Sequence, residues 1–248
     1  PCDVYTDVDG VYTTDPRIES RARRLEKISY EEMLEMASLG ARVLQTRSVE
    51  LAMAKKVPLR VLSSFIEPDE NGALPVNAGT LICDEEEIVE KRIVSGVTMS
   101  RDEARITLLG LSDRVDAPAD VFTRLAEASV NVDMIVQSQA RSEGAVNLTF
   151  TTGRRDAARA ADLMRTHQTD IGFEEIRVDE DVAKVSVVGV GMRSHAGVAQ
   201  TMFRALADKG VKFQAISTSE IKISVLIDAA YAELAVRALH SAYGLDAV

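Results

Sequence analysis

The first clear hydrophobic period of the chain runs from residue 29 to residue 40 and is helical. Met33 and Met36 recur at the spacing of one helix face, and Ser29 and Glu32 precede them in an S-x-x-E pattern. In such a capping box the serine covers a free N–H of the first turn, while the glutamate reaches back to the cap. Gly40 then supplies a C-terminal stop. The pattern therefore predicts a helix between Ser29 and Gly40.

A second helical stretch is predicted over residues 46–56, ended by Pro58, and a short apolar strand is predicted over 59–62. Alternation of strand and helix is typical of an α/β domain. The segment 67–79, EPDENGALPVNAG, has no apolar period and is rich in Pro, Gly, Asn and acidic residues. This composition predicts a linker.

After the linker the sequence predicts an acidic helix over residues 84–92 and a strand over 93–99, and then a pattern that occurs twice. Residues 104–138 can be laid over residues 183–219, with Gly110 opposite Gly189 and matching apolar positions on both sides. Each copy continues with another strand and an Ala-rich helix, predicted at 145–152 and 156–166 in the first and at 221–227 and 231–242 in the second. The sequence therefore predicts the element order β-α-β-β-α twice.

The predicted fold class is α/β followed by α+β. The α+β part is interpreted as two ferredoxin-like βαββαβ modules, each with a four-stranded antiparallel sheet and two helices on one face. Residues 176–178 can close the first module, whereas the second has little chain left after Gly244. We therefore divide the chain into 1–65 for the α/β part, 66–92 for the linker, 93–103 for a strand that completes the second module, 104–180 for the first module and 181–248 for the second.

Composition and charge narrow the classes of partner. The 248 residues carry 39 acidic and 29 basic side chains, a formal charge of −10, which argues against nucleic-acid binding because that affinity needs clustered Lys and Arg. No apolar run reaches the roughly 18–20 residues that span a bilayer, so we expect no membrane contact and a cytoplasmic location. Cys2, Cys83 and three histidines show neither metal-binding nor disulfide spacing, and no metal site is expected.

The loop after the first strand of each copy is a candidate binding site. Free N–H groups at a helix start, together with the helix dipole, favour a carboxylate. Asp113 offers the opposite charge for an ammonium group, so the loop suits a free amino acid, whose two charged ends need those two partners. Further polar contacts come from the following strand, at Asn131, Asp133 and Gln137. The alternative is that the Asp and Ser residues before these helices are plain N-caps.

Six longer motifs together resemble bacterial aspartate kinase, in the form inhibited by lysine plus threonine. They are TDVDGVYTTDPR (6–17), SYEEMLEMASLGARVLQTRSVELA (29–52), VSGVTMSRDEARITLLGLSD (94–113), NVDMIVQ (131–137), VGVGMRSHAGVA (188–199) and ISTSEIKISVLI (216–227). They follow the family order and span nearly the whole chain. The resemblance implies the end of an amino-acid-kinase domain over residues 1 to 65, followed by two ACT modules, the amino-acid-sensing units of the family.

By this resemblance the opening loop is the nucleotide side of the kinase, and the ATP-binding positions are Thr6, Asp7, Tyr12, Arg17, Arg42 and Val43. Asp7 can accept ribose or amide hydrogen bonds, Tyr12 can lie against the nucleotide, and Arg17 can pair with phosphate oxygens. Arg42 replaces the lysine of the family's Gly-Ala-Lys-Val motif, which keeps the charge but changes the donor geometry. A plain acidic turn is the alternative. An EF-hand calcium loop is disfavoured because Tyr5 would occupy its first ligand position.

The resemblance also implies effector-binding positions in both modules: Asp113, Asn131, Val132, Asp133, Gln137, Met192, His195, Ala196, Gly197, Lys212, Phe213, Ser219 and Glu220. The family's Asp-Lys/Arg-Pro-Gly loop is here replaced by residues 113–116, Asp-Arg-Val-Asp, which add a negative charge beside the effector carboxylate. Lys212 and Phe213 replace the family's Asn-Ile, so the effector differs or that pocket is weaker. His195 is interpreted as a loop-ordering residue rather than an acid/base catalyst.

The implied parent reaction is transfer of the γ-phosphoryl group of ATP, with Mg²⁺, to the side-chain carboxylate of aspartate. Pro1 to Tyr5 read as the tail of a strand, and no Lys-Phe-Gly-Gly-Thr start or aspartate-binding motif occurs. We therefore expect part of a longer protein, with no catalytic residue and no activity by itself, that senses lysine and/or threonine and forms a homo-oligomer through its ACT modules. Two alternatives stay open: a non-catalytic ACT regulatory subunit, and a metabolic kinase of the same fold with another substrate.

Overall fold

The computed structural model describes residues 1–247 except 41–42, 68–69, 71–73, 76 and 89–91. Its first part contains a small mixed sheet of strand order β1-β3-β4-β2. Strands β1 (Cys2–Thr6) and β3 (Leu59–Ser63) are parallel and in register, so their carboxyl ends, Thr6 and Ser63, meet at one edge. Strands β4 (Thr80–Cys83) and β2 (Lys27–Ser29) complete this sheet. We call residues 1–88 the N-terminal unit.

Two helices cover this small sheet. Helix α1 (Tyr30–Ser38) begins with the predicted capping box: the Ser29 hydroxyl accepts from Glu32 N, and the Glu32 carboxylate accepts from Ser29 N. Helix α2 (Thr46–Lys55) ends at Lys56 in a left-handed conformation. Met33 and Met36 are buried in the unit's core, as their spacing predicted. Both helix predictions are confirmed.

Other short elements of the N-terminal unit differ from the prediction. The acidic helix predicted over 84–92 is wrong, because the structure has only a single 3-10 turn, η1 (Glu85–Glu87), capped by Asp84. Residues 89–91 of that prediction lie outside the described residues. Strands β2 and β4 were not predicted, since three or four residues are too few for an apolar period to stand out.

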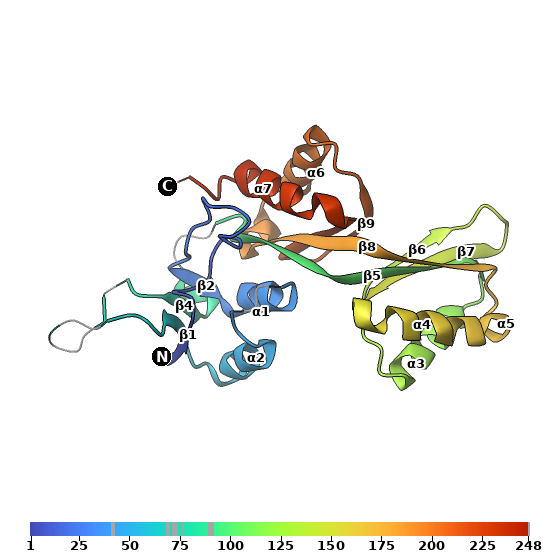
Figure 1. Ribbon diagram of the computed structural model, residues 1–248, viewed down its shortest axis with the longest axis horizontal. Coiled ribbons are helices and arrows are strands. Elements are labelled where there is room, and N and C mark those ends of the chain that lie inside the picture. The colour runs from blue at the N-terminus through green and yellow to red at the C-terminus, as the bar shows by residue number, and fades with distance from the viewer. Residues whose placement is uncertain (41–42, 68–69, 71–73, 76, 89–91, 248) are drawn as a thin grey trace.

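The rest of the chain builds a second, six-stranded sheet of order β6-β7-β5-β8-β10-β9. Its two central strands are long: β5 (Gly96–Ser112) and β8 (Glu175–Val188) run antiparallel through the whole sheet (Figure 1). The outer strands are β6 (Val132–Gln139), β7 (Ala145–Thr152), β9 (Phe213–Thr218) and β10 (Lys222–Asp228). The predicted repeat therefore becomes one continuous sheet.

Two ferredoxin-like modules share the central strands. The first module contains β6, β7, residues 104–112 of β5 and residues 175–179 of β8, with helices α3 (Ala117–Glu127) and α4 (Arg154–Thr166). The second module contains residues 96–100 of β5, residues 182–188 of β8, β10 and β9, with helices α6 (Val198–Asp208) and α7 (Ala232–Ala242). Short helical turns α5 (Gln168–Ile171), η2 (Val190–Ser194) and η3 (Ala229–Tyr231) join these elements.

The pairing of residues 96–100 with 184–188 puts β5 in the closing position of the second module. The divisions predicted at 103/104 and 180/181 fall inside β5 and β8, so the chain has no break at either place, and the domain limits remain predictions. Strand β5 also continues past Gly110 to Ser112, through an irregularity between Leu108 and Leu111.

The helices of the two modules lie on opposite faces of the sheet (Figure 1). Along β8, Val185 and Val187 pack with α6 and α7, whereas Ile176 and Val178 pack with α3 and α4. Successive side chains of a strand point to opposite faces, so odd and even positions of one strand serve the two cores. The apolar side chains of both copies are therefore buried on the two faces of a single sheet.

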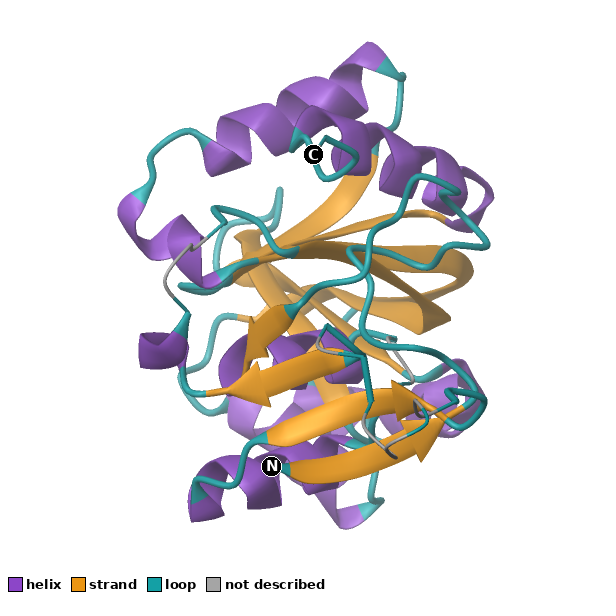
Figure 2. Cartoon of the chain, turned by 90° about the vertical axis from the view of Figure 1, so that its left-hand side faces the viewer, coloured by secondary structure: helices purple, strands orange, loops and turns teal. Residues whose placement is uncertain are grey.

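The free face of the second module is covered by helix α1 of the N-terminal unit. Val188 of β8 belongs to the core formed by α1, α2 and the small sheet. Figure 2 shows the resulting layers: α6 and α7, then the large sheet, then the N-terminal unit. Helices long and apolar enough to cross a membrane do not occur among the described residues.

Candidate nucleotide-side and effector loops

The predicted nucleotide-side loop starts at the carboxyl end of β1. Thr6 is half-buried and its hydroxyl donates to Val8 O over 2.9 Å, while the Asp7 carboxylate is exposed. The end of β3, at Ser63, lies alongside. Ligands of open α/β sheets bind outside the carboxyl ends of parallel strands, so Thr6 and Asp7 lie where a nucleotide is expected.

Two further predicted residues are held by acids of the same loop. The Tyr12 hydroxyl donates to Asp9 Oδ1 over 2.9 Å, and burial together with this carboxylate raises the pKa of Tyr12. The Arg17 guanidinium lies 2.7 Å from Asp15, which lowers the pKa of the Asp15 carboxyl. The Arg17 side chain is 90% exposed, so it can turn toward a phosphate at the cost of this surface ion pair.

The buried side of this loop packs on the second module, which the sequence did not predict. Thr13 Oγ1 lies 2.9 Å from His240 Nε2 of α7, and both residues are fully buried. Nearby, hydrogen bonds from Arg21 lower the pKa of Glu19 to about 2, and Arg21 also contacts Asp246. The Thr13–His240 contact joins residues 227 positions apart, so no local pattern could have indicated it.

The first-module loop presents its acids to solvent. Asp113 N donates to Gly144 O over 3.0 Å, and its carboxylate is exposed. Arg114 contacts Asp120 at 3.1 Å, and Val115 is completely exposed. Helix α3 begins after Asp116, whose side chain makes no cap hydrogen bond, and α6 begins after Gly197, which has no side chain. The plain N-cap alternative therefore fails at both helix starts.

Asp133 in β6 is held by a lysine of the second-module strand. Lys184 Nζ lies 2.5 Å from Asp133 Oδ2 and 2.7 Å from Glu103 Oε1. Burial acts to lower the pKa of Lys184, but the two carboxylates outweigh it and the pKa is raised. The other predicted residues of this strand point elsewhere: Asn131 and Gln137 are exposed, and Val132 packs against the first-module core. Asp133 is thus a carboxylate that already accepts an ammonium group.

The second-module loop folds as the 3-10 turn η2 followed by residues 195–197. Met192 packs against the second-module core. His195 Nδ1 lies 2.8 Å from Gly191 O within the loop, which supports the loop-ordering interpretation; that role stays a prediction. Gly197 has φ +97°, a left-handed conformation that favours glycine, and precedes α6. The first N–H groups of α6 are left without a side-chain cap.

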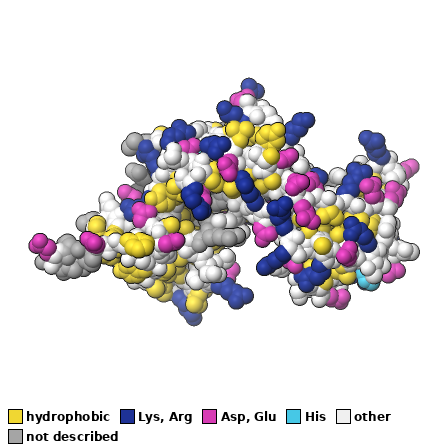
Figure 3. All heavy atoms as spheres, in the orientation of Figure 1, with side chains coloured by type: hydrophobic (Ala, Val, Ile, Leu, Met, Phe, Trp, Pro, Cys, Tyr) yellow, Lys and Arg dark blue, Asp and Glu magenta, His cyan; other side chains and the backbone are white. Residues whose placement is uncertain are grey.

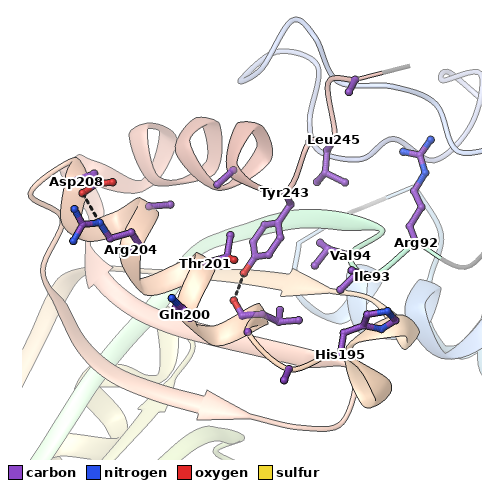
Figure 4. Close-up of a pocket in the computed structure, with 17 residues that line it drawn as sticks. Arg92, Ile93, Val94, His195, Gln200, Thr201, Arg204, Asp208, Tyr243 and Leu245 are labelled. Carbon is purple, nitrogen blue, oxygen red and sulfur yellow. Dashed lines mark hydrogen bonds and ion pairs between the residues drawn. The ribbon is translucent and has the colours of Figure 1, made fainter.

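An open cleft of about 890 Å³ lies beside this loop (Figure 4). Its walls are the loop His195–Gly197, the N-terminal half of α6, the segment Arg92–Val94 and the chain after α7. In one wall the Tyr243 hydroxyl donates a hydrogen bond to Val198 O over 2.7 Å. At the rim, Arg204 pairs with Asp208. The cleft wall therefore contains the uncapped N–H groups at the start of α6 and the side chain of Arg92, both of which favour an anionic group, whereas its carboxylate, Asp208, is already paired with Arg204.

Comparison with the sequences and structures of known proteins shows which family the chain is similar to. A model of the amino acid kinase family matches residues 1–63, and an ACT domain model matches residues 185–243. An aspartokinase of Pseudomonas aeruginosa is 52% identical over 99% of this chain and 58% of its own. The regulatory subunit of aspartate kinase from Thermus thermophilus is 40% identical, with TM-score 0.57, over 61% of this chain and 99% of its own.

The chain belongs to the aspartokinase family. It spans 58% of the length of its Pseudomonas aeruginosa relative. Crystal structures of Escherichia coli aspartokinase III, one with aspartate and ADP and one with lysine and aspartate, align over 97% and 98% of this chain and 51% of theirs. Their TM-scores are 0.77 and 0.76, at 29% and 28% identity. The aspartokinase resemblance and the predicted fold class are both confirmed.

The predicted effector residues of this aspartokinase chain do not form one site. His195, Ala196 and Gly197 line the cleft. Phe213 instead lies against Phe203, Glu220 pairs with Arg193 at 3.4 Å, Ser219 N donates to Lys222 O, and Lys212 is exposed. On the nucleotide side, Val43 is half-buried against the core of the N-terminal unit, and Arg42 lies outside the described residues.

Sequence reasoning missed the cleft walls that come from far along the chain. Arg92 lay in the predicted linker, and Tyr243 directly followed the helix predicted over 231–242, with no sequence feature that indicated a function. Groups of three or more His, Cys, Asp or Glu able to hold a metal do not occur among the described residues. On the face in Figure 3, basic and acidic side chains are interspersed rather than separated.

Proposed function

We propose that this chain is the regulatory C-terminal portion of an aspartokinase and also carries the nucleotide-side end of its kinase domain. The parent enzyme would transfer the γ-phosphoryl group of ATP to the side-chain carboxylate of aspartate. The observation that carries the proposal is the packing of a kinase-family segment directly on an ACT module with an open, charged cleft. Catalysis of phosphoryl transfer rests on positioning and charge, so movement of a packed module can control it.

On the nucleotide side, Thr6, Asp7, Tyr12 and Arg17 would contact ATP. Support comes from their place at the carboxyl end of β1 and from the exposed groups of Asp7 and Arg17. Mg²⁺ would arrive with the phosphates of ATP. The E. coli relative solved with aspartate and ADP covers nearly all of this chain, which supports the same pair of ligands for the parent enzyme.

On the regulatory side, the two module loops would bind lysine and/or threonine. In the second module, the uncapped start of α6 and Arg92 would hold the effector carboxylate. In the first module, Asp133 would take the effector ammonium in place of Lys184. The E. coli relative solved with lysine and aspartate supports an amino acid of this class. An effector can inhibit only by binding an inactive arrangement more tightly than an active one.

Assembly into a homo-oligomer through the modules belongs to the same proposal. Strands β6 and β9 are the two ends of the large sheet, and they expose Ile135, Phe213 and Ile216. An unpaired edge strand with apolar side chains is a template for pairing with another chain. A second copy of this chain is the partner that fits both edges.

A hydroxamate assay for aspartyl phosphate on the full-length protein tests the proposal. We expect turnover that falls when lysine and threonine are added together. Turnover unaffected by either amino acid would overturn the regulatory part of the proposal.

The second candidate is a non-catalytic ACT regulatory subunit. It is favoured by the Thermus thermophilus regulatory subunit, 99% of which aligns with this chain. That subunit aligns with only 61% of this chain, whereas residues 1–63 match the amino acid kinase family. The hydroxamate assay separates the two candidates, since a non-catalytic subunit produces no aspartyl phosphate.

A further inference from the structure

Glu32 occupies the point where helix α1 meets the second module. Its side chain is 2% exposed, and its carboxylate accepts four hydrogen bonds. One oxygen, Oε2, accepts from the backbone N and the hydroxyl of Ser29, at 3.1 and 3.0 Å. The other oxygen, Oε1, accepts from Ser95 Oγ at 2.6 Å and from Val190 N at 2.9 Å. A single carboxylate thus joins the cap of α1 to two segments of the second module.

Both of those segments continue into walls of the cleft. Val190 begins η2, which leads to His195–Gly197, and Ser95 directly follows Arg92–Val94. The two segments are also pressed together, because a Cβ on Gly189 would lie 2.3 Å from Ile93 O and a Cβ on Gly191 would lie 2.5 Å from Arg92 O. A ligand that shifts either wall therefore shifts both donors of Glu32 Oε1.

Helix α1 connects Glu32 to further contacts with the second module and leads into the chain segment that contains Val43. Beyond its last residue, Gly40 is packed so closely on β5 that a Cβ would lie 2.4 Å from Met99 O, and Glu35 pairs with Lys222 of β10 at 2.9 Å. Val43 follows in the ATP-side motif that the family resemblance implies. The nine-residue helix is thus held at its start by Glu32, along its length by the Glu35–Lys222 pair, and just beyond its end by the packing of Gly40 on β5.

We propose that Glu32 is a positioning residue that couples occupancy of the second-module cleft to the nucleotide side of the kinase through helix α1. The inference rests on the proposed function, because it names how that cleft would act on the enzyme. An energetic link of this kind needs a discrete element that both sites bias, and the proposal assigns that role to the Oε1 hydrogen bonds to Ser95 and Val190.

Two single-hydroxyl deletions separate coupling from folding. Ser95→Ala removes the short bond to Glu32 Oε1 and leaves the capping box intact, whereas Ser29→Ala removes the cap hydroxyl and leaves both Oε1 bonds in place. Glu32→Gln is a third variant, because its amide has a single acceptor oxygen and a donor NH2 group where the carboxylate has two acceptor oxygens. Each variant is assayed in the full-length protein with lysine plus threonine.

For Ser95→Ala and Glu32→Gln we expect at least about a fivefold rise in the effector concentration for half-inhibition, the lower range of allosteric coupling. Effector binding measured by calorimetry should stay within about threefold. Ser29→Ala should melt at a lower temperature but keep wild-type inhibition. As a second readout, effectors should change amide exchange of residues 30–38 in the wild type and not in Ser95→Ala.

The outcomes separate this inference from the proposed function. Inhibition of the wild type with unchanged inhibition of Ser95→Ala would overturn the role of Glu32 and leave the proposed function standing. A wild type that neither lysine nor threonine inhibits would overturn the proposed function and the coupling with it. Equal loss of inhibition in Ser29→Ala and Ser95→Ala would also contradict the coupling role, because helix stability alone would then explain both.

Discussion

Lys184 and its two carboxylates form a buried charge cluster at the junction of the modules. Lys184 is 5% exposed and Glu103 is 6% exposed, while half of the Asp133 side chain is open to solvent. A buried ion pair adds little net stability, but the loss of one partner leaves an uncompensated buried charge. The cluster therefore fixes how β6 of the first module meets β8.

Replacement of Lys184 by methionine should be strongly destabilising. The Lys184→Met variant leaves the Glu103 carboxylate buried without the ammonium at 2.7 Å, and we expect a loss of about 3–5 kcal/mol in the free energy of unfolding. Urea unfolding measures this loss. The double variant Lys184→Met/Glu103→Gln should recover part of it, and no recovery would show that packing rather than charge is responsible.

His240 should give the protein a measurable pH dependence. Burial lowers the pKa of His240 below its ordinary value of 6.5, although Glu19 and Asp246 oppose the shift. Below pH 6.5 the unfolded chain binds a proton at His240 that the folded chain does not bind. The free energy of unfolding should therefore decrease as the pH is lowered from 6.5, until the pH reaches the lowered pKa of the folded state. The slope for one proton is at most about 1.4 kcal/mol per pH unit.

Urea unfolding between pH 7 and 5 tests this expectation. His240→Gln can still bond Thr13 and cannot titrate, so its slope in this window should be smaller than that of the wild type. Equal slopes for wild type and His240→Gln would contradict the assignment.

At the scale of elements, helix α1 explains which predictions succeed. Its start is encoded within four residues, Ser29 to Glu32, and its buried face within one turn, so local pattern suffices. The role of Glu32 was not predictable, because its other partners, Ser95 and Val190, lie 63 and 158 positions away. The Thr13–His240 contact and the walls of the cleft were not predictable for the same reason, because they too join residues far apart in the sequence.

The close packing of α1 on β5 predicts a severe effect at Gly40. Gly40 has φ +117° and no room for a Cβ against Met99 O, so Gly40→Ala should push the helix end away from the strand. Gly210→Ala is the matched control, since Gly210 has φ +68° and open space around it. A left-handed conformation alone costs about 1–2 kcal/mol, and the clash should add about 1–3 kcal/mol.

Thermal unfolding of both glycine variants measures the difference. A melting temperature for Gly40→Ala clearly below that of Gly210→Ala is the expected result. Equal melting temperatures would show that α1 can move away from β5 without cost, which would also weaken its role in coupling.

At the scale of the whole molecule, the repeat predicted two modules but not the way they join. Equal spacing of apolar residues indicated the same fold twice, and residues 93–103 were predicted to complete the second module. That one strand, β5, serves both modules depends on pairing across the sheet. The opposite placement of the helices then follows from the alternation along β8.

The exposed edges of this sheet predict how copies assemble. Charged substitutions in both edge strands, Ile135→Lys with Ile216→Lys, should shift the chain toward monomer, because an edge lysine opposes strand pairing. Val115→Lys, at a fully exposed loop position, is the control and should leave assembly unchanged. Sedimentation analysis measures the masses, and an oligomer unaffected by the double substitution would exclude these edges as the interface.

The central claim is that the two modules bind an amino-acid effector, and calorimetry of this chain tests it most directly. Lysine and threonine are titrated separately and then together, with glutamate as a control of opposite side-chain charge to lysine. We predict a saturable heat from at least one of the two effectors and none from glutamate. No heat from lysine or threonine, alone or together, would contradict the claim.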